Sequence, residues 1–197
     1  MSRIAPLAIL FTLGSGLRAQ AATPPTDSAL AAITTRGRAL AAYDYAAWHG
    51  TDAVLALHPP PGSVTDYIAR PTDSGWVVAF GHASAARDTF YIAYEALPTE
   101  PADSAHPYAA VAREDPIADT GYFSRAYRAS HTARADFRGA KRPYNVAILP
   151  APDGNWWVYL VPAPTVAGVW PLGGDVRYLI SPEGNAILER RRLHNAI

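Results

Sequence analysis

Three segments of the chain have the pattern of a β-hairpin, in which two strand-forming runs flank a short cluster of turn-forming residues. The turn clusters are PTDSG at 71–75, PDGN at 152–155 and SPEGN at 181–185. Val, Ile, Tyr and Trp, which favour strands, are concentrated on both sides of each cluster. Connections this short join antiparallel strands, because parallel strands need a crossover of a dozen or more residues. The pattern therefore predicts antiparallel β-structure along most of the chain.

Two segments have the spacing of amphipathic helices. The first begins near Ala29, after capping candidates at 26–28, and has small or apolar residues at steps of three or four. Because glycine costs helix stability, we expect this helix to break near Gly50. The second is expected from residue 119 or 120 to Phe137.

The remaining segments complete the expected topology. TFYIAYEAL at 89–97 predicts a third strand after the first hairpin, whereas 98–116, rich in Pro, Ala, Asp and Glu, is expected to be a loop. The element order is then helix, three strands, helix, four strands. This order predicts an α+β fold: one curved antiparallel sheet of β-hairpins with two main helices packed against one face. The resemblance of IARPTDSGWVVAF to AILPAPDGNWWVYL is open to two interpretations, an internal duplication or a chance similarity.

The start of the chain has the pattern of an export signal. A short basic start precedes an apolar run at 4–13, and Ala19-Gln20-Ala21 fits a signal-peptidase site. We expect a signal peptide at 1–21, an extended leader at 22–28 and a single α+β domain at 29–197, either whole or lacking a C-terminal portion. The protein is then periplasmic or secreted. No later stretch is long and apolar enough for a membrane helix, so no membrane insertion is expected after cleavage.

The amino-acid composition argues against several classes of function for this chain. The chain has no cysteine, which excludes disulfides and thiolate chemistry, and its 17 basic and 17 acidic residues give no excess charge for nucleic-acid binding. The six histidines have no paired metal-ligand spacing, and the common phosphate-loop, zinc-helix and nucleophile-elbow motifs are absent. We expect neither a metal nor a cofactor.

The candidate catalytic residues are His49 and Asp52. At a spacing of three they share a helix face, where a carboxylate can orient an imidazole for general-base chemistry. The structural alternative is a helix end, where His49 contacts the last carbonyls and Asp52 caps the next turn.

The candidate binding residues are aromatic and basic. Trp156 and Trp157 are adjacent in an expected strand and must point to opposite faces, so one of them faces away from the main core. A run of three arginines at 190–192 is suited either to recognising a carboxylate or phosphate or to protecting an edge strand from association. Arg177 and Arg191 are the basic candidates.

Charge predicts the register of the last hairpin. Pairing Ile180 with Ala186 sets Arg177 opposite Glu189 and Asp175 opposite Arg191, whereas a slip by one residue sets Arg177 opposite Arg190. We expect the complementary register because like charges directly opposite are unfavourable.

These observations favour an exported, non-catalytic domain that binds an unidentified small ligand or protein through an aromatic-rich sheet. The alternative is a periplasmic hydrolase built on His49 and Asp52.

Overall fold

The computed structural model describes residues 24–100, 103–139, 141–166, 168–169, 171 and 173–194. The expected signal peptide at 1–21 lies outside the described residues. Two helices and eight strands make up the fold, in the order α1 (Asp27–Leu55), β1 (Asp66–Thr72), β2 (Gly75–Ala83), β3 (Phe90–Pro98), β4 (Tyr108–Asp119), α2 (Tyr122–Asp136), β5 (Tyr144–Pro150), β6 (Trp156–Pro162), β7 (Val176–Ile180) and β8 (Ile187–Arg192). A short 3₁₀ turn, η1 (Pro152–Gly154), joins β5 to β6.

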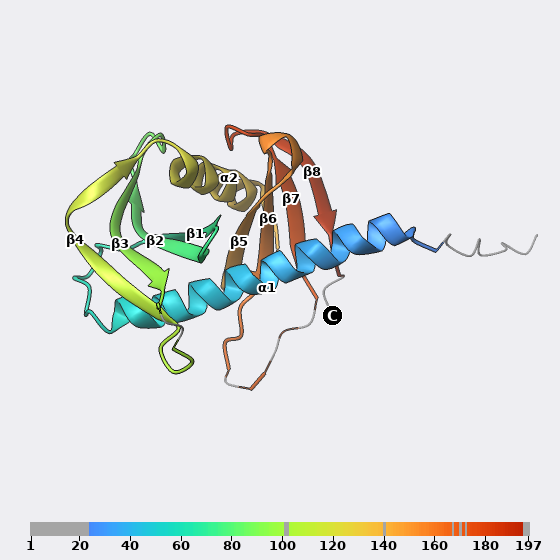
Figure 1. Ribbon diagram of the computed structural model, residues 1–197. Coiled ribbons are helices and arrows are strands. Elements are labelled where there is room, and N and C mark those ends of the chain that lie inside the picture. The colour runs from blue at the N-terminus through green and yellow to red at the C-terminus, as the bar shows by residue number, and fades with distance from the viewer. Residues whose placement is uncertain are drawn as a thin grey trace, which may run out of the picture.

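The strands form two antiparallel sheets, β1-β2-β3-β4 and β5-β6-β7-β8, each preceded by one helix. The α+β class is therefore confirmed, and so is the expectation that the second and third hairpins are neighbours in one sheet. The structure has two sheets where the sequence predicted one. In Figure 1, α2 lies between the two sheets and α1 runs past both of them. Neither described helix is long and apolar enough to cross a membrane.

Strand β4 occupies much of the segment that was expected to be a loop. It is an edge strand that pairs only with β3, and of its residues only Tyr108 is buried. An edge strand tolerates Pro116 and the charged residues before it, because its outer side makes no ladder hydrogen bonds. The strand was therefore not predictable from the composition of this segment.

Helix α1 is continuous through Gly50, so the expected break is wrong. Thr26 caps its first turn by accepting a hydrogen bond from the Ala29 amide at 3.2 Å. Gly50 is buried, and a Cβ at this position would lie 3.1 Å from the Cβ of Ala96 and 3.3 Å from Val78 Cγ2. The glycine allows the helix to approach β2 and β3 closely, and this packing outweighs its low helix propensity.

The first amide groups of helix α2 donate hydrogen bonds to the side chain of Asp119. Asp119 Oδ1 accepts hydrogen bonds from the amides of Gly121, Phe123 and Ser124 at 2.9–3.1 Å. One carboxylate thus satisfies several of the unpaired donors of the first turn and complements the helix dipole. The expected start near Asp119 and end near Phe137 agree with the structure to within a few residues.

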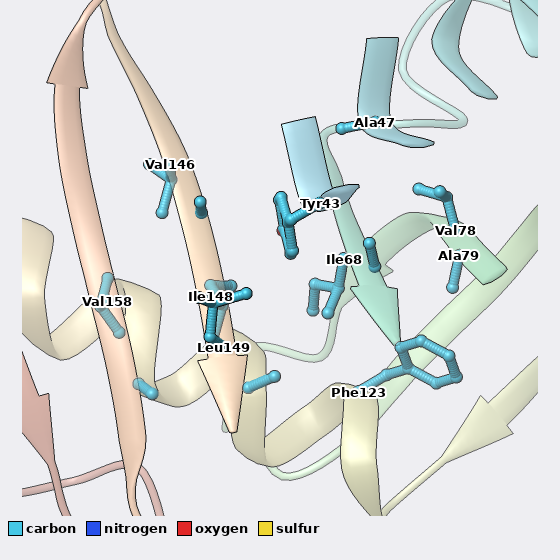
Figure 2. Close-up of a cluster of buried hydrophobic side chains, with 14 of the residues drawn as sticks. Tyr43, Ala47, Ile68, Val78, Ala79, Phe123, Val146, Ile148, Leu149 and Val158 are labelled. Carbon is cyan, nitrogen blue, oxygen red and sulfur yellow. The ribbon is translucent and has the colours of Figure 1, made fainter. Parts of the chain in front are cut away.

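The two halves of the chain share one hydrophobic core. Figure 2 shows Tyr43 of α1, Ile68 of β1, Phe123 of α2 and Ile148 of β5 in the same cluster, with Val158 of the neighbouring strand β6 at its left edge. Each half also places its first hairpin directly after its helix. A proline lies opposite a tryptophan at the turn of both hairpins, Pro71 opposite Trp76 and Pro150 opposite Trp156.

The register expected for the β7–β8 hairpin is wrong. Arg177 lies opposite Arg191 and Tyr178 opposite Arg190, and a bulge follows at Leu179. The observed alignment differs from the expected one by two residues. A shift of two residues leaves each side chain on the expected face of the sheet. Arg177 therefore still forms an ion pair with Glu189, its diagonal neighbour, at 2.7 Å.

Contacts with α2 explain the observed register. Asp136 accepts hydrogen bonds from the Tyr178 hydroxyl at 3.1 Å and from Arg190 at 3.3 Å, which holds these two residues together. The turn also binds α2: Arg128 donates to the carbonyl of Glu183 at 2.8 Å, and Thr132 donates to that of Gly184 at 2.7 Å. These tertiary bonds outweigh the cross-strand charge pairing.

Candidate functional site

A cavity of about 320 Å³ lies beside the C-terminal end of α2, on the side of the second sheet that faces this helix. The volume is at the lower end of the range of small-molecule sites. Its lining residues are Phe137, Arg138, Gly139, Arg142, Tyr144, Pro162, Gly173, Gly174, Val176, Tyr178, Arg190, Arg192 and His194.

The alternation of strand residues builds one wall of this cavity. Val176 and Tyr178 of β7 share a face with Arg190 and Arg192 of β8, because side chains two residues apart point the same way. The opposite wall is the segment that follows α2. Helix α2 ends when Phe137 adopts an extended conformation, which carries Arg138 and Arg142 toward the sheet.

The cavity wall is strongly cationic. Four arginines line it, and no carboxylate of the described residues does. Arg190 pairs with Asp136, and Arg138 donates to the backbone carbonyls of Ala135 and Phe137. Within the described part of the chain, Arg138, Arg142 and Arg192 form no ion pair.

The rest of the wall includes the aromatic side chains of Phe137, Tyr144 and Tyr178. The rings of Phe137 and Tyr144 meet edge to face, with centroids 4.7 Å apart. Tyr178 is fully buried, and its hydroxyl donates to Asp136. Burial, together with this hydrogen bond, raises the pKa of Tyr178 to about 12, so the residue is a neutral donor at physiological pH. His194, which also lines the cavity, has its Nδ1 2.7 Å from Asp175 Oδ2.

The four binding residues expected from the sequence lie outside this cavity. As expected, the adjacent tryptophans point to opposite faces. Trp156 is buried and donates its ring N–H to the carbonyl of Pro182 at 3.0 Å, whereas Trp157 is half-buried on the other face. The guanidinium groups of Arg36 and Arg177 lie 5.3 and 4.3 Å from the Trp157 ring centroid. Arg191 is exposed on β8.

The candidate catalytic residues, His49 and Asp52, lie on α1 and also outside the cavity. The His49 ring packs against Tyr45 and Trp48, with centroid distances of 4.3 and 4.7 Å. Because α1 continues to Leu55, His49 lies before the last turn and Asp52 lies within it, so Asp52 does not cap a following turn as the structural alternative required. In the described structure no hydrogen bond joins the two side chains, and no group of three or more His, Asp or Glu residues could hold a metal ion.

Sequence reasoning missed the arginines at 138 and 142. They lie about fifty residues before the arginine run of β8, and only the packing of α2 on the sheet brings the two groups together. The sequence feature that could have indicated these two arginines is their position just after the predicted end of α2. Comparison with known proteins finds no matching family model, no matching curated protein and no matching solved structure.

Proposed function

We propose that this chain is an exported, non-catalytic binding domain whose ligand is a small anionic molecule held in the cavity between α2, β7 and β8. The observation that carries the proposal is the presence of Arg138, Arg142 and Arg192 in one concave wall, where they form no ion pair with a carboxylate of the described residues. Like charges held close together are unfavourable, and a bound anion would relieve their repulsion. Guanidinium groups also match the planar geometry of carboxylate and phosphate oxygens.

The aromatic wall supports a ligand with a flat apolar part. Phe137 and Tyr144 offer ring surfaces next to the arginines, and Val176 adds an aliphatic contact. Ligand sites commonly combine such apolar walls with a few convergent polar groups. An aromatic carboxylate or phosphate fits this combination.

Binding is favoured over hydrolysis by the composition of the cavity wall. His194 and Asp175 are paired, an arrangement that can orient a general base. A covalent hydrolase mechanism also needs a nucleophile, and the lining contains no serine or threonine. The packing of His49 against Tyr45 and Trp48 likewise supports a structural role for that histidine.

Calorimetric titration with phenyl phosphate, benzoate and neutral benzamide tests the binding proposal. We expect the two anions to bind and benzamide not to bind. Arg142→Gln and Arg192→Gln should each weaken anion binding about tenfold, which corresponds to the loss of one charge-assisted contact. Lys141→Gln is the matched control, because Lys141 is exposed next to Arg142 and does not line the cavity. Equal binding of benzamide, or an equal effect of the control, would contradict the proposal.

Export is tested separately. The signal pattern at 1–21 supports a mature chain that begins at Ala22, which intact-mass measurement of exported protein would detect. Exported material that retains residues 1–21 would contradict cleavage at this site.

A further inference from the structure

Strand β8 is an edge strand that, within the described residues, pairs only with β7. It is the last strand of the order β5-β6-β7-β8, and all six of its residues are exposed. The amide of Leu193 donates to the Asp175 carbonyl at 3.0 Å, so the backbone groups of Leu193 point toward β7. Because successive residues of a strand alternate, the N–H and C=O groups of Arg192 and Arg190 point away from β7. These backbone groups are available to a further strand.

The side chains of this edge are cationic on both faces of the sheet. Arg190 and Arg192 line the cavity, whereas Arg191 lies on the opposite face, opposite Arg177. The nearby carboxylate of Glu189 is paired with Arg177. Three successive arginines thus lie along the free edge: Arg190 is paired with Asp136, whereas Arg191 and Arg192 form no ion pair within the described residues.

The positive charge of the β8 arginines determines which kind of strand can pair with β8. A second copy of β8 would bring arginines against arginines, which is unfavourable. An extended segment with successive acidic residues would instead place carboxylates alternately beside Arg190 and Arg192 on one face and beside Arg191 on the other. Main-chain hydrogen bonds then supply affinity, and the alternating side chains supply specificity.

We propose that β8 accepts an acidic polypeptide segment as an additional strand, so that the natural anionic ligand of the cavity is an acidic side chain of that segment. This inference rests on the proposed function, because two of the three arginines that contact the segment belong to the cavity wall. It goes further in naming the partner as an extended acidic peptide and in assigning a binding role to Arg191 and to the β8 backbone.

A set of three blocked peptides tests the inference on the intact mature protein. The first has three consecutive glutamates between valines and threonines, which favour strands. The second is identical except that alternate backbone amides are N-methylated, so that it keeps every charge but loses the donors needed for pairing. The third has glutamine in place of glutamate. Binding is measured by calorimetry at low salt, with phenyl phosphate titrated into the same protein.

We expect the first peptide to bind about tenfold or more tightly than either of the other two. Arg191→Gln should weaken binding of the first peptide several-fold, whereas Lys141→Gln should leave it unchanged. If the N-methylated peptide binds as tightly as the first peptide, strand addition is overturned, because charge alone then accounts for binding. If phenyl phosphate binds and no peptide does, the inference is overturned and the proposed function stands. If neither the peptides nor phenyl phosphate bind, both fail.

Discussion

Arg177 and Arg191 lie directly opposite each other in the β7–β8 pair, although both are cationic. Arg177 nevertheless has two favourable contacts, although its buried Nε has no hydrogen-bond partner among the described residues. Its guanidinium carbon lies 4.3 Å from the centroid of the Trp157 ring, and its Nη2 donates to Glu189 Oε1 at 2.7 Å. The Arg177 side chain is only 9% exposed, so these contacts must compensate for the desolvation of its charge.

We therefore expect Glu189→Gln to reduce the free energy of unfolding by about 1–2 kcal/mol, since it leaves a buried arginine without its ionic partner and facing another arginine. The Glu189 side chain is 45% exposed, which keeps the loss below that of a fully buried pair. Urea denaturation measures the change. Adding Arg191→Gln should recover part of it by removing the like charge. If Arg191→Gln recovers no stability in the Glu189→Gln background, Arg191 does not act on Arg177.

Gly184→Ala should destabilise the protein, because the β7–β8 turn packs on the backbone of α2. A Cβ at Gly184 would lie 2.5 Å from the carbonyl oxygen of Arg125 and 2.7 Å from the amide nitrogen of Ala129. We expect a loss of about 2–4 kcal/mol, from overpacking together with the strain of a positive φ. Gly62→Ala is the control. Gly62 has a similar φ of +83° and no atom within 4 Å of its Cβ position, so it measures backbone strain alone. Equal losses in the two variants would contradict the packing argument.

The two glycines of α1 should respond differently to alanine. Nothing lies within 4 Å of a Cβ at Gly37, so Gly37→Ala should stabilise the protein by about 0.5–1 kcal/mol through helix propensity. Gly50→Ala gains the same propensity but presses against the Cβ of Ala96 and against Val78, which are short and cannot move away. We expect it to be less stable than Gly37→Ala by at least about 1 kcal/mol. Thermal and urea denaturation of both variants check this difference.

Stability should fall at alkaline pH. The pKa of Tyr178 is raised from 10.0 to about 12 by burial and by its hydrogen bond to Asp136, and burial also raises the pKa of Tyr43 and of Tyr122. The folded protein therefore holds these protons more tightly than the unfolded chain. The resulting stabilisation is complete below pH 10 and is lost as the pH rises from about 10 toward 12.

Urea denaturation at about pH 9 and about pH 11 measures this effect. Tyr178→Phe should lose less stability between the two pH values than the unsubstituted protein, even though loss of the hydrogen bond to Asp136 lowers its stability at the lower pH. An unchanged pH dependence in this variant would mean that Tyr178 does not contribute to the alkaline transition.

The local elements of this protein were determined by the sequence itself. Turn-forming clusters at 71–75, 152–155 and 181–185 locate the three hairpins, and each joins two antiparallel strands, although the register of the third differs from the expected one. Period-two alternation places Trp156 and Trp157 on opposite faces of their sheet. These features depend on the conformational preferences of neighbouring residues, which a sequence displays directly.

Features that depend on distant contacts were decided only by the tertiary structure. Asp136 of α2 sets the alignment of Tyr178 with Arg190, and the close approach to Ala96 keeps α1 unbroken at Gly50. The candidate site has the same origin, because its arginines come from two segments about fifty residues apart. Such features were not predictable from local patterns, since a helix–sheet contact can outweigh both the cross-strand charge pairing and the low helix propensity of glycine.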